Sequence, residues 1–395
     1  MRAIKIIVLI TTFIILFATC IDKKPEKREP LITEEIPKTV TYESYTGSEK
    51  CASCHKDIYE QHLKTNHYLT SLPATEKNIK GSFKKGKNIF HYNPDLYIEM
   101  KKTDSGLRQV VYYHNEEKIS LPFDITMGSG NKGQSFIYWN KNSLFQLPLT
   151  YFTDAGRWAN SPGFPAKVQY ERPITSRCLE CHTTFAEVVV PGGMRPDLYD
   201  RNKIILGIGC EKCHGPGAAH VAFHEANPLD TAAKFIVNPS SLSRQQNIDI
   251  CALCHGGRKE KTKPSFSFTP GDTLSHFFAD NAVTSFGEAD VHGNQLALLQ
   301  SSKCFKMSGT MTCGTCHDPH VNERGMLKSF SQKCMSCHNT PHKNISGNRL
   351  AVKEINNNCI DCHMPAKPSA NIVLFMGNKK SIAAKFRTHH IAVYK

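Results

Sequence analysis

Several features that would place this sequence in a familiar class are missing from it. Its 395 residues contain no segment that repeats at a fixed period, so the chain is not a solenoid. The glycine-rich run MGSGNKGQS at 127–135 lacks the Gly-Lys-Ser/Thr ending of a phosphate-binding loop and falls between predicted strands, which favours a turn. The apolar run at 6–18 is too short to cross a bilayer comfortably. No output module of a sensor protein is recognisable.

Cysteine, by contrast, is plentiful and regularly spaced. Fourteen of the 16 cysteines form seven CxxCH motifs, whereas shuffling a chain of this composition would produce roughly 0.03 such motifs. CxxC pairs also occur in zinc sites and disulfides, but neither requires a histidine after every second cysteine. Two thiols three residues apart, followed by histidine, suit thioether bonds to the vinyl groups of a haem, with the histidine as proximal iron ligand. The sequence therefore predicts seven c-type haems.

Each motif supplies two attachment cysteines and one proximal histidine. The predicted attachment residues are Cys51, Cys54, Cys178, Cys181, Cys210, Cys213, Cys251, Cys254, Cys313, Cys316, Cys334, Cys337, Cys359 and Cys362. The predicted proximal ligands are His55, His182, His214, His255, His317, His338 and His363.

The density of motifs changes how composition and charge are interpreted. Seven haems leave about fifty residues of chain for each cofactor, too few for an ordinary hydrophobic core, so the haems themselves must form much of the core. The formal charge of +14 would be offset by about fourteen propionate charges, partly balanced by ferric iron. A nucleic-acid partner is therefore not expected.

The N-terminal residues predict export. Arg2 and Lys5 precede the apolar run, and Cys20 ends the segment LFATC, which resembles a lipoprotein cleavage site; the alternative is an ordinary signal peptide with an incidental cysteine. Residues 1–20 are thus a signal segment, and residues 21–46, rich in Lys, Glu and Pro, are a flexible tether. We expect a periplasmic or outer-membrane-associated protein held to the membrane by a lipid on Cys20.

The rest of the chain divides at a long interval without haem motifs. Residues 47–70 carry the first motif, and residues 71–177 contain short β-branched and aromatic runs such as RQVVYYHN and QSFIYWN, which are typical of antiparallel strands. Residues 178–395 hold six motifs, with short helices expected between them. The predicted fold is a mostly α-helical and irregular multihaem cytochrome c built around stacked haems, with one β-rich antiparallel insert.

Histidine is abundant enough to supply the second ligand of every iron. Twelve histidines lie outside the motifs, and Met364 directly follows a proximal histidine, so it cannot reach the opposite face of the haem. The other methionines show no spacing of their own. Predominantly bis-histidine ligation follows, which implies low reduction potentials. In CGTCHDPH, His320 lies on the side already occupied by His317, so we expect it to bind a neighbouring haem.

Four segments carry a family resemblance. SEKCASCHKDIYEQHLKTNH, CEKCHGPGAAH, VHGNQLALLQSSKCFKMSGTMTCGTCHDPH and CIDCHMP resemble the multihaem cytochromes c related to the tetrahaem electron carrier of ammonia oxidisers and to hydroxylamine oxidoreductase. The resemblance covers the haem regions and not the β-rich insert. It implies distal ligands at His67, His220 and His320, with weaker matches at His292 and His342.

The remaining candidates are less specific. In RTHHIAVY, either His389 or His390 is a candidate for closing the last haem, and the pattern does not decide between them. Cys304 is expected to be a buried thiol, with iron ligation as the alternative. The substitute distal ligands are His62, His91, His114, His224 and His276.

Two functions fit these residues. The first is an electron carrier whose haems exchange electrons with redox partner proteins or a quinol-linked membrane complex. The second is an oxidoreductase that converts a small nitrogen or sulfur compound at one haem with an open sixth position. The lysine-ligated CxxCK signature of pentahaem nitrite reductases is missing, and no tyrosine is identifiable as the crosslink of a hydroxylamine oxidoreductase haem. Electron transfer is the favoured interpretation.

Lipidation makes a direct prediction. Cys20→Ser should move the protein from the membrane fraction to the soluble fraction, because the only acylated thiol is lost; immunoblots of fractionated cells measure this. Cys304→Ser, the same substitution at the other cysteine outside the motifs, should leave the protein at the membrane. Unchanged membrane association of the Cys20 variant would rule out the lipid anchor.

Overall fold

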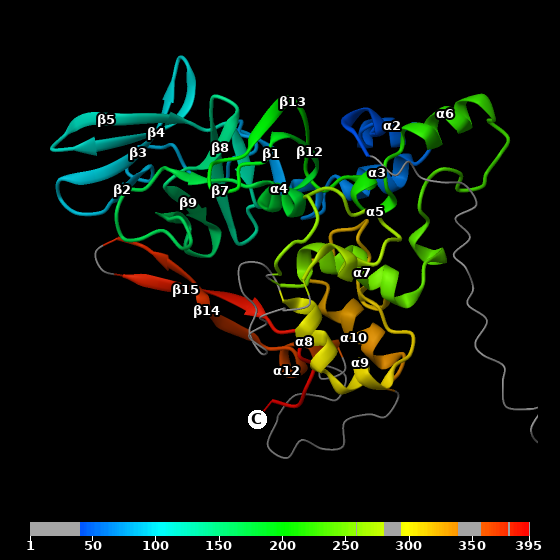
Figure 1. The fold of residues 1–395 in the computed structure, drawn as a ribbon. Helices are drawn as coiled ribbons and strands as arrows, with labels where there is room; N and C mark the ends of the chain where they lie inside the picture. The colour runs from blue at the N-terminus through cyan, green and yellow to red at the C-terminus, as the bar shows by residue number, and fades with distance from the viewer. Residues whose placement is uncertain (1–39, 258, 280–293, 339–356, 378–379, 395) are drawn as a thin grey trace, which may run out of the picture. The chain divides into compact units, whose positions relative to one another are not determined.

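The computed structural model describes residues 40–257, 259–279, 294–338, 357–377 and 380–394 (Figure 1). The structure is about 28% helical and about 28% strand, and its strands form several antiparallel sheets. The expectation of a mostly α-helical fold is therefore wrong. The α-helices in the described part of the chain are short, between 4 and 12 residues, so strands make up as much of the ordered backbone as helices do.

Two hairpins in the haem-rich half account for part of this error. Strand β12 (Thr183–Val190) begins directly after the second motif and pairs with β13 (Leu198–Leu206). Strand β14 (Ala366–Phe375) follows the last motif and pairs with β15 (Ser381–Arg387). Both hairpins contain β-branched runs, which pack well on a pleated surface and lose side-chain freedom in a helix. Short helices between the motifs were thus too simple an expectation.

Eleven short strands lie between Ser71 and Pro173 and form two sheets. In the four-stranded sheet, alternation directs Ile98 and Met100 into the core, while Glu99 and Lys101 face outward. This sheet has the order β2 (Ile89–His91), β3 (Leu96–Thr103), β4 (Gly106–Tyr113) and β5 (Glu116–Pro122). The seven-stranded sheet contains β1 (Ser71–Pro73), β6 (Ile125–Met127), β7 (Gly133–Asn140), β8 (Ser143–Gln146), β9 (Leu149–Phe152), β10 (Arg157–Asn160) and β11 (Arg172–Pro173).

The glycine-rich run at 127–135 joins β6 to β7. Gly128 and Gly130 adopt φ angles of 102° and 80°, in the left-handed region that glycine enters without a steric penalty. Because β6 and β7 are antiparallel neighbours, the run connects the two strands of a hairpin rather than opening a helix around a phosphate.

A shared apolar core fixes the two sheets together. Ile98 and Met100 of the smaller sheet and Phe136 of the larger are fully buried in one cluster, which also contains Trp158. Gln109, also fully buried, bridges the sheets because its amide donates to the Leu149 carbonyl at 3.0 Å and accepts from the Leu149 backbone N–H at 3.2 Å.

Short helices carry the haem motifs, and several of them end at the motif histidine. The longest, α7 (Arg244–His255), starts with a capping box between Ser243 and Gln246. The other α-helices are α2 (Ser48–Cys51), α3 (Lys56–His62), α4 (Ser176–His182), α5 (Cys210–His214), α6 (Ala218–Ala226), α8 (Gln295–Ser301), α9 (Lys303–Met307), α10 (Leu327–Met335) and α12 (Cys359–His363). The 3₁₀ helices are η1 (Tyr42–Ser44), η2 (Tyr68–Thr70), η3 (Thr153–Ala155), η4 (Pro239–Ser241), η5 (Leu274–Phe277) and η6 (Cys313–Thr315).

The hairpin β14–β15 connects the last motif with the larger sheet. Ile372, Leu374 and Ala384 of the hairpin form a buried cluster with Phe152 and Ala159 of β9 and β10. The chain after β15 then returns to α12, since the Ala392 N–H donates to the His363 carbonyl at 3.2 Å. Within the described residues, no helix has the length and apolar character needed to cross a membrane.

The Gln109 bridge predicts a large loss of stability. Gln109→Leu should lower the free energy of unfolding by about 2–4 kcal/mol, because both backbone groups of Leu149 lose a buried partner. Urea denaturation followed by circular dichroism measures this. Gln61→Leu, the same substitution at an exposed helix position, should change it by less than about 0.5 kcal/mol. Equal stability of the two variants would show that the bridge contributes little.

Candidate haem sites

Each CxxCH motif folds into one helical turn that gathers its reactive groups. The backbone N–H of His55 donates to the Cys51 carbonyl at 2.9 Å, and the His317 N–H donates to the Cys313 carbonyl at 2.9 Å. Residues three and four positions apart lie on one face of a helix, so both thiols and the imidazole point the same way. All the described cysteines are free thiols, as thioether formation requires. The described part of the chain contains no group of three or more His, Cys, Asp or Glu side chains placed to hold a metal ion.

Hydrogen bonds at Nδ1 orient four of the motif histidines. His214 and His363 donate from Nδ1 to the Val237 and Ala392 carbonyls, each at 2.9 Å. A carbonyl only accepts, so the proton is on Nδ1 and the lone pair is on Nε2, the usual iron ligand. The Nδ1 atoms of His317 and His182 lie 3.2 Å from Glu323 Oε2 and 3.0 Å from Thr70 Oγ1.

Three pairs of histidine rings have the spacing that an iron between them needs. A metal–imidazole nitrogen bond is about 2 Å long and the ring centre lies about 1.1 Å behind the nitrogen, so rings on opposite sides of one iron have centroids about 6 Å apart. The centroids of His67 and His255 are 6.2 Å apart, those of His214 and His320 are 6.1 Å apart, and those of His317 and His389 are 6.1 Å apart. In each pair one ring belongs to a CxxCH motif and the other does not. These residues therefore fit a haem bound by two imidazoles.

The protein around five of the site histidines favours the neutral imidazole, the form that binds iron. Burial is the main cause that lowers the pKa of His67, His182 and His389 to about 4 from an ordinary value of about 6.5. Burial also lowers the pKa of His214 and His255. At neutral pH all five rings are uncharged and can bind a metal.

The predicted distal histidines fall into three groups. His67, His320 and His389 each face a motif histidine, as described above. His220 lies on α6, which the ion pair between Lys50 Nζ and Glu225 Oε1, 2.8 Å apart, connects to the first motif helix. Burial is the main cause that lowers the pKa of His220, and its Nδ1 donates to the Lys234 carbonyl at 2.8 Å. His292, His342 and Cys20 lie outside the described residues.

His390 and the substitute histidines have other surroundings. The His390 ring contacts Tyr394 rather than a motif histidine, with centroids 6.3 Å apart. His62 and His224 donate from Nε2 to the Ile208 and Ala232 carbonyls, at 2.8 and 3.1 Å, so the nitrogen that usually binds iron is engaged. The exposed substitutes are His91, His114 and His276. Cys304 is half-buried rather than fully buried.

Direct hydrogen bonds connect most of the motifs to one another. The Cys210 N–H donates to Ser48 Oγ of the first motif helix at 3.3 Å, and Lys333 Nζ of the sixth motif donates to the Cys316 carbonyl of the fifth at 2.6 Å. The Cys359 N–H of the seventh motif donates to Ser331 Oγ of α10 at 3.0 Å. These hydrogen bonds link the first motif to the third, the fifth motif to the sixth, and the sixth motif to the seventh.

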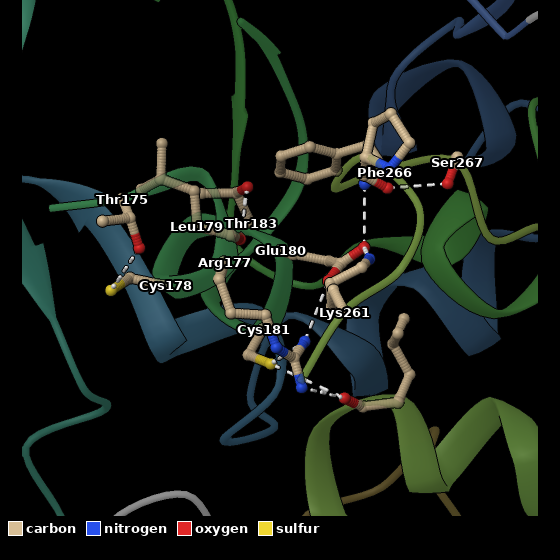
Figure 2. Close-up of polar contacts among 12 residues, drawn as sticks. Thr175, Arg177, Cys178, Leu179, Glu180, Cys181, Thr183, Lys261, Phe266 and Ser267 are labelled. Atoms are coloured by element: carbon tan, nitrogen blue, oxygen red, sulfur yellow. Dashed lines mark hydrogen bonds and ion pairs between the residues drawn. The ribbon is translucent and has the colours of Figure 1, made fainter. Parts of the chain in front are cut away.

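A buried carboxylate joins the second motif to the fourth. Glu180 lies between Cys178 and Cys181 and is fully buried, with Arg177 and Lys261 as its ionic partners (Figure 2). Arg177 also donates from Nη2 to the Leu253 carbonyl of the fourth motif at 2.9 Å. Sequence reasoning missed this cluster, because Lys261 lies in a charged run that resembles an ordinary solvated surface. The one available signal was the position of Glu180 inside a CxxC pair.

Known proteins resemble parts of this chain. A family described as "Cytochrome c554 and c-prime" matches residues 162–215, which include the second and third motifs. The multiheme cytochrome MtrA of Shewanella baltica (strain OS185) is 26% identical over 201 residues, covering 50% of this chain and 55% of MtrA. The C-type polyheme cytochrome OmcC of Geobacter sulfurreducens is 22% identical over 211 residues, covering 47% of this chain and 25% of OmcC.

A solved structure shares the fold. The crystal structure of the outer cell wall cytochrome OcwA superposes with a TM-score of 0.50 at 16% identity, covering 85% of this chain and 80% of OcwA. The chain spans about half the length of MtrA and about a quarter of OmcC. These similarities support c-type haem and a multihaem cytochrome, but they do not single out the electron carrier of ammonia oxidisers or hydroxylamine oxidoreductase.

The ring pairs predict which C-terminal histidine binds iron. His389→Ala should convert one low-spin haem to high-spin, because the His317 ring loses its partner, whereas the matched His390→Ala should leave all haems low-spin. Electron paramagnetic resonance of the oxidised protein counts the two species.

A double variant tests whether the pairs are separate. Combining His320→Ala with His389→Ala should produce two high-spin haems, because the two side chains face different motifs. One high-spin haem in the double variant, or a high-spin haem in His390→Ala, would contradict the arrangement.

Proposed function

We propose that this chain, which belongs to the multihaem c-type cytochromes, carries electrons at the cell envelope through a row of seven covalently attached haems. When bound, each haem supplies a reversible one-electron couple. The protein residues attach the haems, hold the axial histidines and set the distances between the irons. The observation that carries the proposal is the set of hydrogen bonds and ring pairs that connects the motifs to one another.

The connections support a path along which an electron can pass. His320 follows the fifth motif and faces His214 of the third, so the distal ligand of one haem belongs to the chain segment that attaches another. His67 in the same way connects the first motif segment with His255 of the fourth. Since each such connection fixes two macrocycles against one backbone segment, neighbouring haems stay close without large motions of the protein.

We assign the axial ligands on the same basis. His67, His320 and His389 are the proposed distal ligands for the haems on His255, His214 and His317, and His220 is proposed for the haem on His55. Bis-histidine ligation supplies two neutral nitrogen donors and no thioether, which favours low potentials. His292 and His342 are proposed for two of the remaining irons on their sequence context alone.

The proposal also includes export of the chain from the cytoplasm and its anchoring to a membrane. The segment at 1–20 would direct the chain out of the cytoplasm, where haem is attached, and a lipid on Cys20 would hold it at a membrane. OcwA is named as an outer cell wall cytochrome, in line with a location in the envelope. The partners would be redox proteins or a quinol-linked membrane complex, with the haem edges as points of exchange.

An oxidoreductase is the second candidate, and one observation favours it. Among the described residues, His182, like His338, is not paired with a histidine ring from outside the motifs, and of these two it is the one that Thr70 orients through Nδ1. A haem there with an open sixth position would bind a small nitrogen or sulfur compound directly.

Voltammetry of the purified holoprotein on an electrode separates the two functions. A carrier should show reversible electron uptake and release equal to seven electrons per chain, with no extra current when nitrite or hydroxylamine is added. Electron paramagnetic resonance should show seven low-spin haems that are unchanged by nitrite, hydroxylamine or nitric oxide. A catalytic current together with a high-spin haem that shifts on addition would establish the oxidoreductase instead.

A further inference from the structure

Charged side chains are concentrated where the second, third and fourth motifs meet. Glu180 is fully buried, and its carboxylate accepts hydrogen bonds from Arg177 Nη1 at 2.9 Å, Lys261 Nζ at 2.5 Å and the Phe266 N–H at 2.8 Å (Figure 2). The three donors come from before the second motif and from the loop after the fourth. A carboxylate with this many partners has a fixed position and a fixed set of neighbouring charges.

The cations outnumber the carboxylate. Arg177 lies against the second motif, with Nη1 3.2 Å from Cys181 Sγ, and its guanidinium is 5.2 Å from the centre of the Phe278 ring. Lys212, inside the third motif, holds its ammonium 4.7 Å from the centre of the Phe266 ring. Arg177 and Lys261 both pair with the single carboxylate of Glu180, and Lys212 lies beside the Phe266 ring of the same loop, so the positive charges here outnumber the negative one.

The surroundings of the cluster are poor in water. The Lys261 side chain is 11% exposed and Glu180 is 0% exposed. Burial lowers the pKa of Lys261, although the nearby Glu180 carboxylate acts in the opposite direction. Charges in such surroundings are screened less than surface charges, so their effect reaches further.

We propose that Glu180 and Lys261 set the reduction potential of the haems on the second and fourth motifs, with Lys261 raising it and Glu180 holding it down. The inference rests on the proposed function, because it requires haems at these motifs. Reduction of a ferric haem adds one electron from the redox partner and forms no bond, so the haem loses one positive charge. Nearby cations stabilise the reduced state, and a nearby carboxylate stabilises the oxidised state.

Coulomb's law gives the size of the effect. One unit charge about 10 Å from an iron, at an effective dielectric constant of about 20, changes the equilibrium between oxidised and reduced haem roughly tenfold. For a one-electron couple this is a shift of about 59 mV. A shift of this size decides whether the electron occupies that haem more or less often than its neighbours.

Potentiometric titration of the full haem-loaded chain, followed by optical spectra, tests the proposal. Glu180→Gln should raise one or two of the seven midpoint potentials by about 59 mV, a tenfold change, and leave the others in place. Lys261→Gln should lower the same components by a similar amount. The double variant, which removes one charge of each sign, should restore values close to those of the original protein.

Controls separate this effect from a general change in charge. Glu116→Gln and Lys118→Gln remove the same charges from an exposed pair in the four-stranded sheet, 2.5 Å apart, and should shift no component. A structural role for the cluster would change haem content or thermal stability in both the Glu180 and Lys261 variants without opposite shifts in potential. Haem content per chain, measured for every variant, identifies that case.

The experiment still tests the inference if one variant fails to retain its haems. If Glu180→Gln does not retain seven haems, Lys261→Gln alone still provides the sign of the effect, because Arg177 remains as a partner for Glu180. No shift in assembled Lys261→Gln, a shift in the wrong direction, or equal shifts of all seven components would overturn the inference. The electron-carrier function would stand in each case, because its own test depends on electron counts and catalytic currents.

Discussion

Pairs of imidazoles about 6 Å apart are the contacts on which the proposed haem ligation depends. Each pair brings together segments that are distant in the sequence, such as the end of the first motif segment and the fourth motif. In ordinary domains such long-range contacts come from apolar side chains, and here the helices are too short to bury much area by themselves. The binding of two histidines to one haem iron would therefore supply stabilising long-range contacts that the packing of these short helices does not.

The β-structure takes part in positioning these ligands. Thr70, just before β1, contacts His182 Nδ1, and the neighbouring Ser71 donates from Oγ to the His182 carbonyl at 2.6 Å. At the other end of the chain, Arg387 at the end of β15 donates to the Met364 carbonyl at 2.8 Å, and Ser302 donates to the His389 carbonyl at 3.1 Å. The β-structure thus contacts the chain at the C-terminal ends of the second and seventh motifs rather than forming a separate appendage.

Covalent chemistry explains which parts of this arrangement were predictable. The CxxCH spacing is dictated by the haem itself, so it can be recognised in the sequence. The expectation that His320 binds a neighbouring haem came from its position three residues after His317. His389 and His390 have the same sequence context, and only the structure distinguishes them, because the His389 ring faces His317 whereas the His390 ring contacts Tyr394. The hairpins β12–β13 and β14–β15 were missed because the motifs beside them suggested helices.

Two carboxylates inside neighbouring motifs show why residue type alone does not reveal a role. Glu211, in the third motif, accepts from the backbone N–H groups of Thr46, Gly47 and Gly217 at 2.8, 2.9 and 2.7 Å. Burial raises the pKa of Glu211, and its partners carry no net charge. Its role is therefore to hold the backbone at 46–47, just before the first motif, against the third motif. Glu180 is buried to a similar degree but is held by two cationic side chains, which makes its surroundings a source of net charge. The two carboxylates differ in their hydrogen-bonding partners. Several of those partners lie in loops that come close to the motifs only in the folded structure, so the sequence does not reveal them.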